Sequence, residues 1–141
     1  MDKELLKQNI ENAFANFKAA IALHENINTK RADGGWSVGE TGNHIVKSTG
    51  VDFGATQSTE RPYDKHAAAI KKLFLNYTIK FPADPSLWPD TKHYSGDEIF
   101  TSLDKNKLAV FKMISNEDLT KTCTDIELPV WGTLTKSEWL V

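Results

Sequence analysis

The feature that most constrains this fold is an uninterrupted apolar repeat at the start of the chain. Apolar side chains recur at steps of three and four residues, and neither glycine nor proline occurs between residues 2 and 28. The repeat consists of Leu6, Ile10, Ala13, Phe14, Phe17, Ala20, Ile21, Leu23 and Ile27. This spacing gathers apolar side chains on one face of a helix. We therefore predict a single amphipathic helix from about Asp2 to Asn28.

A second helix is predicted to begin near Ser37. Ser37 and Glu40 have the spacing of a capping box, in which each side chain bonds a backbone N–H at the helix start. Three glycines follow: Gly39, Gly42 and Gly50. Each costs a helix about 1 kcal/mol relative to alanine. Tertiary packing must therefore hold this helix, and a close approach of another helix would explain the glycines.

Two further helices are expected. The segment 65–81 predicts a third, shorter helix with four residues inward: Ile70, Leu73, Phe74 and Tyr77. Ser95 and Glu98 form another capping box, before a fourth helix that runs to about Ser115. Its inward residues are expected to be Ile99, Phe100, Leu103, Leu108, Phe111 and Ile114.

The connections between these helices are expected to be irregular. Three prolines lie within eight residues: Pro82, Pro85 and Pro89. Proline ends helices and removes a backbone donor, so an irregular crossing is predicted there, of a kind that often lines a cleft. From Asn116 to Leu134 the chain is again expected to be irregular, with a short extended piece near Asp125–Leu128. Pro129 and Gly132 predict turns around Val130 and Trp131.

The final residues predict the start of one more helix. Thr135 and Glu138 form a third capping box, and the apolar residues after it are Trp139, Leu140 and Val141. Only six residues, Lys136 to Val141, remain to form this helix. An isolated helix becomes marginally stable only at roughly 12 to 15 residues. We therefore expect this chain to be a truncated form of a longer design.

Composition sets the broad class of the protein. The chain has 141 residues, a length that fits one domain spanning 1–141, and a net charge of −2. No run of five like charges occurs, so nucleic acid and membrane surfaces are not expected partners. The lone Cys123 rules out an intramolecular disulfide framework and is interpreted as a buried, inert thiol. No signal peptide or spanning segment is recognised, and a cytoplasmic location is expected.

Two segments carry a family resemblance: WSVGETGNHIVKS, and PVWGTLTKSEWL after a helix ending NEDLTKTCTDIEL. Both resemble the DinB-like superfamily of metalloenzymes, in matching order along nearly the whole chain. The resemblance implies an all-α, up-down four-helix bundle with long irregular connections, whose last helix is incomplete here. Members of this superfamily are associated with metal-dependent hydrolysis and with thiol transfer to small electrophiles.

The resemblance also implies a metal site with His44 as its first ligand. The family places two more histidines one turn apart in the last helix, and the matching positions would lie beyond Val141. Three neutral imidazoles and an open position suit zinc or nickel, which lower the pKa of bound water to about 7. One imidazole holds such an ion poorly. We therefore expect an incomplete metal site, and the sequence leaves open whether the chain is an enzyme acting on a small-molecule substrate.

Other interpretations of the candidate residues stay open. Helical phase alone would place His44 on a flank of its helix, away from the apolar stripe. Glu40, one turn earlier, could orient its imidazole or serve the capping box alone. His24, expected on the apolar face of the first helix, is a substitute ligand or an ordinary core-edge histidine. Trp88 could wall a pocket, as could Trp131, which otherwise reads as a packing anchor.

A function from another class is also compatible with the sequence. An incomplete bundle would expose an apolar groove, and such surfaces usually find a partner or self-associate. The alternative is therefore a non-catalytic helical module that binds a small molecule or a protein and forms a homodimer.

Overall fold

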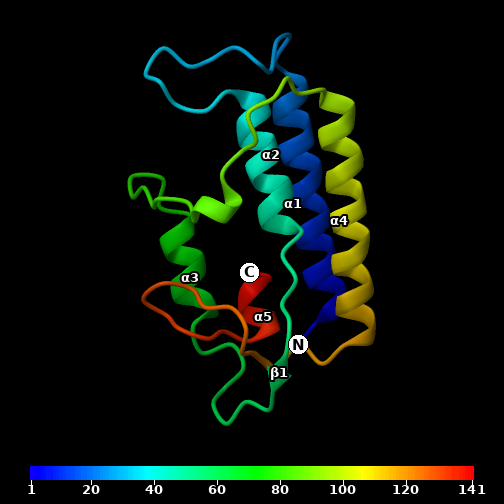
Figure 1. The fold of residues 1–141 in the computed structure, drawn as a ribbon. Helices are drawn as coiled ribbons and strands as arrows, with labels where there is room; N and C mark the ends of the chain where they lie inside the picture. Colours follow the sequence, from blue (N-terminus) through cyan, green and yellow to red (C-terminus); the bar gives the residue numbers. More distant parts are fainter. The chain divides into compact units, whose positions relative to one another are not determined.

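The computed structural model describes all residues, Met1–Val141, and its regular structure is predominantly helical (Figure 1). The helices are α1 (Lys3–Ala22), α2 (Val38–Thr49), α3 (Ala67–Phe74), the 3₁₀ turn η1 (Pro85–Leu87), α4 (Gly96–Asn116) and α5 (Lys136–Trp139). The strands are β1 (Thr56–Gln57) and β2 (Thr122–Cys123). The predicted helical class is thereby confirmed, with a two-stranded sheet that the sequence did not predict.

The chain forms two compact units, which we call unit 1 and unit 2. Unit 1 comprises residues 1–51 and 83–116, and unit 2 comprises residues 52–82 and 117–141. That residues 1–141 act as one domain stays a prediction. No helix has the length and apolar character needed to cross a membrane.

Unit 1 is built from α1, α2 and α4, which pack against one another. The helix α1 runs opposite to α2 and α4 (Figure 1). The centre of its apolar core is formed by Ile21, Tyr94, Ile99 and Leu103. Two ion pairs also tie α1 to α4: Lys18 to Asp104 at 2.9 Å and Lys107 to Glu11 at 2.8 Å. From the repeat that predicted α1, Ile21 lies in this core, and Phe14, Phe17 and Ile27 pack against it. The expectation was wrong for Ala13, Ala20 and Leu23, which are exposed.

The glycines of α2 mark the close approach that the sequence predicted. A Cβ atom on Gly39 would lie 2.8 Å from the Cβ of Tyr94, and one on Gly42 would lie 2.9 Å from Cδ1 of Ile99. Both distances are shorter than carbon atoms tolerate without movement. The two glycines thus allow α2 to approach Ile99 in the first turn of α4 and Tyr94, two residues before α4, closely.

The predicted end of the first helix at Asn28 was wrong, because α1 ends at Ala22. The side chain of Asn26 accepts a hydrogen bond from the backbone N–H of Asn28 at 2.9 Å, and the carbonyl of Ile27 accepts from the N–H of Gly39 at 2.7 Å. These bonds give the backbone partners outside a helix. Apolar periodicity continued beyond the point where local side-chain bonds ended the helix.

The helix α3 is shorter than the segment that predicted it. Ile70 is buried as expected, but Phe74 and Tyr77 were wrongly placed inward, since Tyr77 is 83% exposed. The Asn76 side chain accepts hydrogen bonds from the backbone N–H and the hydroxyl of Thr78 and so turns the chain. In α4, Leu108 was also wrongly placed, because it is 65% exposed.

Unit 2 contains the antiparallel pair β1–β2, in which Thr56 lies opposite Cys123. The extended piece predicted at Asp125–Leu128 was wrong in position, since the strand is Thr122–Cys123. The carboxylate of Asp125 accepts a hydrogen bond from the backbone N–H of Ala55 at 2.8 Å. At this position a side-chain oxygen therefore takes the place of the backbone carbonyl that would continue the strand pairing. The helix α5 begins with the predicted capping box of Thr135 and Glu138.

Candidate functional site

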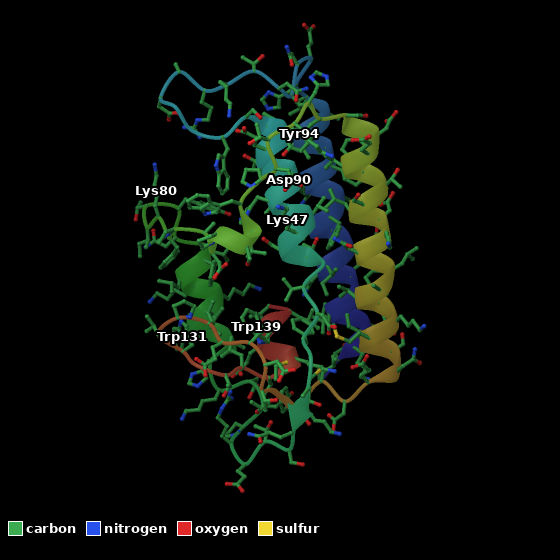
Figure 2. The ribbon with its side chains drawn as sticks, in the orientation of Figure 1. Lys47, Lys80, Asp90, Tyr94, Trp131 and Trp139 are labelled. Carbon is green, nitrogen blue, oxygen red and sulfur yellow. The ribbon has the colours of Figure 1, made fainter.

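His44 lies on a face of α2 that contacts η1 and the segment after it. Its Nδ1 is 2.8 Å from the carbonyl oxygen of Leu87, and its ring is 5.1 Å from the ring of Trp36. One turn later, Lys47 donates to the carboxylate of Asp90 at 2.8 Å, and Figure 2 labels this pair. This face of α2 is therefore occupied by polar contacts within unit 1.

The contact with Leu87 fixes how the His44 imidazole carries its proton. A carbonyl oxygen can only accept a hydrogen bond, so Nδ1 of His44 must donate. In the neutral ring, Nε2 then keeps a free lone pair. Histidines that ligate metals commonly have this arrangement, with one ring nitrogen donating to a carbonyl and the other binding the ion. His44 is half-buried, and its geometry is compatible with a ligand and equally with a structural anchor.

The carboxylate of Glu40 takes part in the capping box of α2 and also forms an ion pair with Lys30. Its carboxylate accepts from the backbone N–H of Ser37 at 2.9 Å and from the ammonium of Lys30. The hydrogen bond from Lys30, followed by that from the Ser37 N–H, holds the pKa of the Glu40 carboxyl below its usual value. The hydrogen-bond partner of His44 is the carbonyl of Leu87, so the orienting role considered for Glu40 is filled by backbone.

His24 lies beyond the end of α1 and beside an open hollow of about 550 Å³ in unit 1. Apolar side chains from α1, the following turn and α4 contribute to this hollow: Ile21, Ile27 and Phe100. His24 and His93 also line it, and both are exposed. The expected position of His24 on the apolar face of the first helix was wrong, because that helix ends before it.

The two tryptophans considered as pocket walls lie elsewhere. Trp88 is 55% exposed, and its indole N–H donates to the carbonyl of Ala83 at 2.9 Å. In unit 2, the ring of Trp131 lies 5.3 Å from that of His66. Neither tryptophan lines the hollow beside His24.

The residues present do not form a complete metal site. No group of three or more histidine, cysteine, aspartate or glutamate side chains is arranged to hold an ion. Cys123 is a free, buried thiol, and burial raises its pKa, which leaves little thiolate at neutral pH. His44 is therefore not accompanied by the further ligands that three-histidine chemistry requires.

Unit 2 contains a buried ionic site that sequence reasoning missed. The carboxylate of Glu138 accepts two hydrogen bonds from the Arg61 guanidinium, at 2.8 and 2.7 Å. It also accepts from the backbone N–H groups of His66 at 2.8 Å and Thr135 at 2.9 Å. Its side chain is fully buried. Glu138 could be read from sequence only as a cap, because Arg61 lies 77 residues away in a polar loop.

The environment of Glu138 favours its charged form. Burial alone would raise the pKa of this carboxyl, but the Arg61 bonds and the two backbone N–H groups outweigh burial and lower the pKa to about 2. Each carboxylate oxygen has at least two partners within unit 2. A fully bonded carboxylate is suited to holding loops together rather than to accepting a proton.

Comparison with protein-family models, with curated proteins and with solved structures finds no match for this chain. The functional interpretation therefore depends on the chain's own residues and on the resemblance of its two motifs.

Proposed function

We propose that this chain is a DinB-like helical protein of the metal-dependent hydrolase or thiol-transferase type, with His44 at one ligand position of a zinc or nickel site. The proposal includes an up-down four-helix bundle with long irregular connections, whose last helix is incomplete. The observation that carries it is the bond from Nδ1 of His44 to the Leu87 carbonyl, which leaves Nε2 able to bind an ion.

The described residues do not supply the other ligands, so the proposed site is incomplete within one copy of the chain. A single imidazole should bind zinc or nickel weakly and reversibly. Histidines from another segment or another copy would be needed for tight binding. Weak but specific association at His44 is the behaviour expected of this protein.

The proposal is tested by titrating Zn²⁺ into the protein while the imidazole nitrogens of its four histidines are observed by ¹⁵N NMR. Before zinc is added, we expect His44 to be protonated at Nδ1. With zinc, Nε2 of His44 should shift first, and metal retention should fall in His44→Ala but not in His93→Ala. A His44 ring protonated at Nε2, or equal zinc retention in His44→Ala and wild type, would contradict the proposal.

A second function is favoured by the hollow beside His24. Its apolar side chains, with two histidines nearby, would suit a small molecule that has an apolar body and a hydrogen-bonding group. In this alternative the chain is a non-catalytic binding module that self-associates as a homodimer.

The alternative is tested with anilinonaphthalene sulfonate as an apolar, anionic probe. Its fluorescence and the amide shifts of residues 21–28 should respond to binding, and Ile27→Trp should fill the hollow and abolish both responses. Leu108→Trp, on an exposed part of α4, is the control. Sedimentation over a range of concentrations tests the homodimer. Probe binding that survives Ile27→Trp would contradict a binding site in the hollow. A monomer at every concentration would contradict the homodimer.

A further inference from the structure

The end of α3 and the turn after it expose a group of large apolar side chains in unit 2. We call this surface the α3 tip, and it comprises Phe74, Leu75, Tyr77, Ile79 and Phe81. Each of the five is at least 43% exposed. The rings of Phe74 and Phe81 lie 5.6 Å apart and bring the ends of the turn together. Contiguous exposed apolar side chains of this kind usually mark an interaction surface.

The charged residues within the segment that contains the α3 tip, residues 65–82, all have one sign, and Asp64 and Asp84 flank that segment. From Lys65 to Pro82 the chain contains four lysines and no aspartate or glutamate. Lys71 and Lys72 are exposed in α3, and Lys80 is exposed in the turn that follows (Figure 2). None of the four lysines takes part in the protein's nine ion pairs. The surface is therefore apolar and cationic, and its lysines have no ion-pair partner within the chain.

We propose that the α3 tip binds the surface of an anionic lipid bilayer. Lysines near such a surface gain electrostatic attraction from the lipid headgroups, while phenylalanine and tyrosine side chains suit the boundary between headgroups and acyl chains. The charge favours this occupant over a second copy of the chain, because symmetrical pairing of the tip would bring like-charged lysines together. An acidic peptide would share the charge but normally needs a groove or a strand edge, and the tip is a turn at the end of a helix.

This inference is independent of any metal at His44. It differs from the expectation that membrane surfaces are not partners, which was based on the absence of a run of like charges. The four lysines are dispersed over sixteen positions without forming such a run. The predicted third helix also placed Phe74 and Tyr77 inward. The short α3 and its following turn are what leave these aromatic rings exposed beside the lysines.

The test is co-sedimentation of the full chain with vesicles of phosphatidylcholine, with and without phosphatidylserine. We expect binding to the anionic vesicles only, weakening as ionic strength rises. Each lysine near the bilayer should contribute about fivefold in affinity, so the triple variant Lys71→Gln, Lys72→Gln, Lys80→Gln should lose about 100-fold. Lys105→Gln, Lys112→Gln, Lys121→Gln changes the net charge equally at exposed lysines elsewhere and should bind like wild type.

A second pair of variants tests the apolar part of the surface. Leu75→Ser with Tyr77→Ser should weaken vesicle binding at least tenfold, since both side chains are exposed and neither makes a ring contact with a neighbour. Leu23→Ser with Leu108→Ser removes two large exposed apolar side chains from unit 1 and should have no effect. Circular dichroism would establish that all variants are folded.

The proposal is overturned if the wild type does not bind anionic vesicles, or if the two triple-lysine variants lose affinity equally. It is also overturned if vesicles are not bound and sedimentation shows a dimer that Leu75→Ser with Tyr77→Ser abolishes, because the occupant would then be a second copy. None of these outcomes depends on zinc binding, so failure here is distinguishable from failure of the proposal for His44.

Discussion

Unit 1 and unit 2 are stabilised by different kinds of interior. In unit 1 the core cluster consists of three apolar side chains on α1 and α4 and the ring of Tyr94, just before α4. In unit 2 the helices are short, and four of the protein's five buried polar or charged residues lie there: Thr122, Thr135, Ser137 and Glu138. Unit 2 also has buried apolar residues: Ile70, Leu119, Cys123 and Leu134. Unit 1 therefore depends on shape and apolar area, whereas unit 2 combines a small apolar core with completed hydrogen bonds around one buried charge.

The largest effect is expected from removing that charge. Glu138→Gln leaves the Arg61 guanidinium without its carboxylate, and breaking a buried ion pair in this way typically costs about 3–5 kcal/mol. We expect hydrogen exchange and limited proteolysis to show selective opening of unit 2. Glu127→Gln, an exposed glutamate of the same unit, is the matched control and should change stability little. An equal loss of stability in both variants would show that the Arg61–Glu138 ion pair contributes no more to unit 2 than an exposed glutamate does.

Acid should reproduce much of this effect without mutation. The pKa of Glu138 is lowered from 4.5 to about 2, so its stabilisation is present above the unfolded-state value and is lost as pH falls from about 4.5 towards 2. At 1.36 kcal/mol for each pKa unit, the total is roughly 3 kcal/mol. Acid titration of wild type and Glu138→Gln, followed by circular dichroism, measures it. The variant should lack this contribution, and identical acid profiles would contradict the assignment.

Unit 1 should respond most to a change of shape. Gly39→Ala places a Cβ 2.8 Å from Tyr94, and such overpacking costs about 1–3 kcal/mol, part of which the better helix propensity of alanine offsets. Gly96→Ala, at the start of α4, meets no atom within 4 Å and is the control. Thermal unfolding should show a loss for the first variant and none for the second. Equal melting temperatures would mean that Tyr94 moves aside freely.

The smallest effect is expected at His44. Removing its hydrogen bond to Leu87 by His44→Ala should cost about 1 kcal/mol, the net value of an ordinary intramolecular hydrogen bond. Amide exchange in residues 85–90 would report the loss. His93→Ala, at an exposed histidine, should stay within about 0.5 kcal/mol of wild type. A loss at His44 several times larger would indicate that the residue is chiefly a structural anchor.

The starts and ends of the helices were not equally predictable from the sequence. The starts of α2 and α5 were correctly predicted because a capping box is complete within four residues, as at Ser37–Glu40 and Thr135–Glu138. The end of α1 was missed because hydrogen bonds formed by Asn26 and Ile27 ended the helix while the apolar period continued. The end of α4, predicted at about Ser115 and observed at Asn116, was found because the apolar period and the helix stop together.

The sites were less predictable than the helices. The motif resemblance singled out His44, but its partner Leu87 lies 43 residues away in a segment with no regular pattern. Arg61 and Glu138 are farther apart still, and neither position carries a signal that would pair them. Long-range polar contacts are set by the packing of loops, and a single sequence contains no period or spacing from which such packing can be derived.

The most direct test of the difference between the units is amide hydrogen exchange at neutral pH and at about pH 3, corrected for intrinsic exchange rates. We predict that the N–H groups of Cys123, Lys136 and Ser137 in unit 2 lose protection in acid, while those in the centres of α1 and α4 keep most of theirs. Glu138→Gln should already show the weakened unit 2 at neutral pH. Equal loss of protection in both units, or no loss in unit 2, would contradict the claim that one buried carboxylate stabilises it.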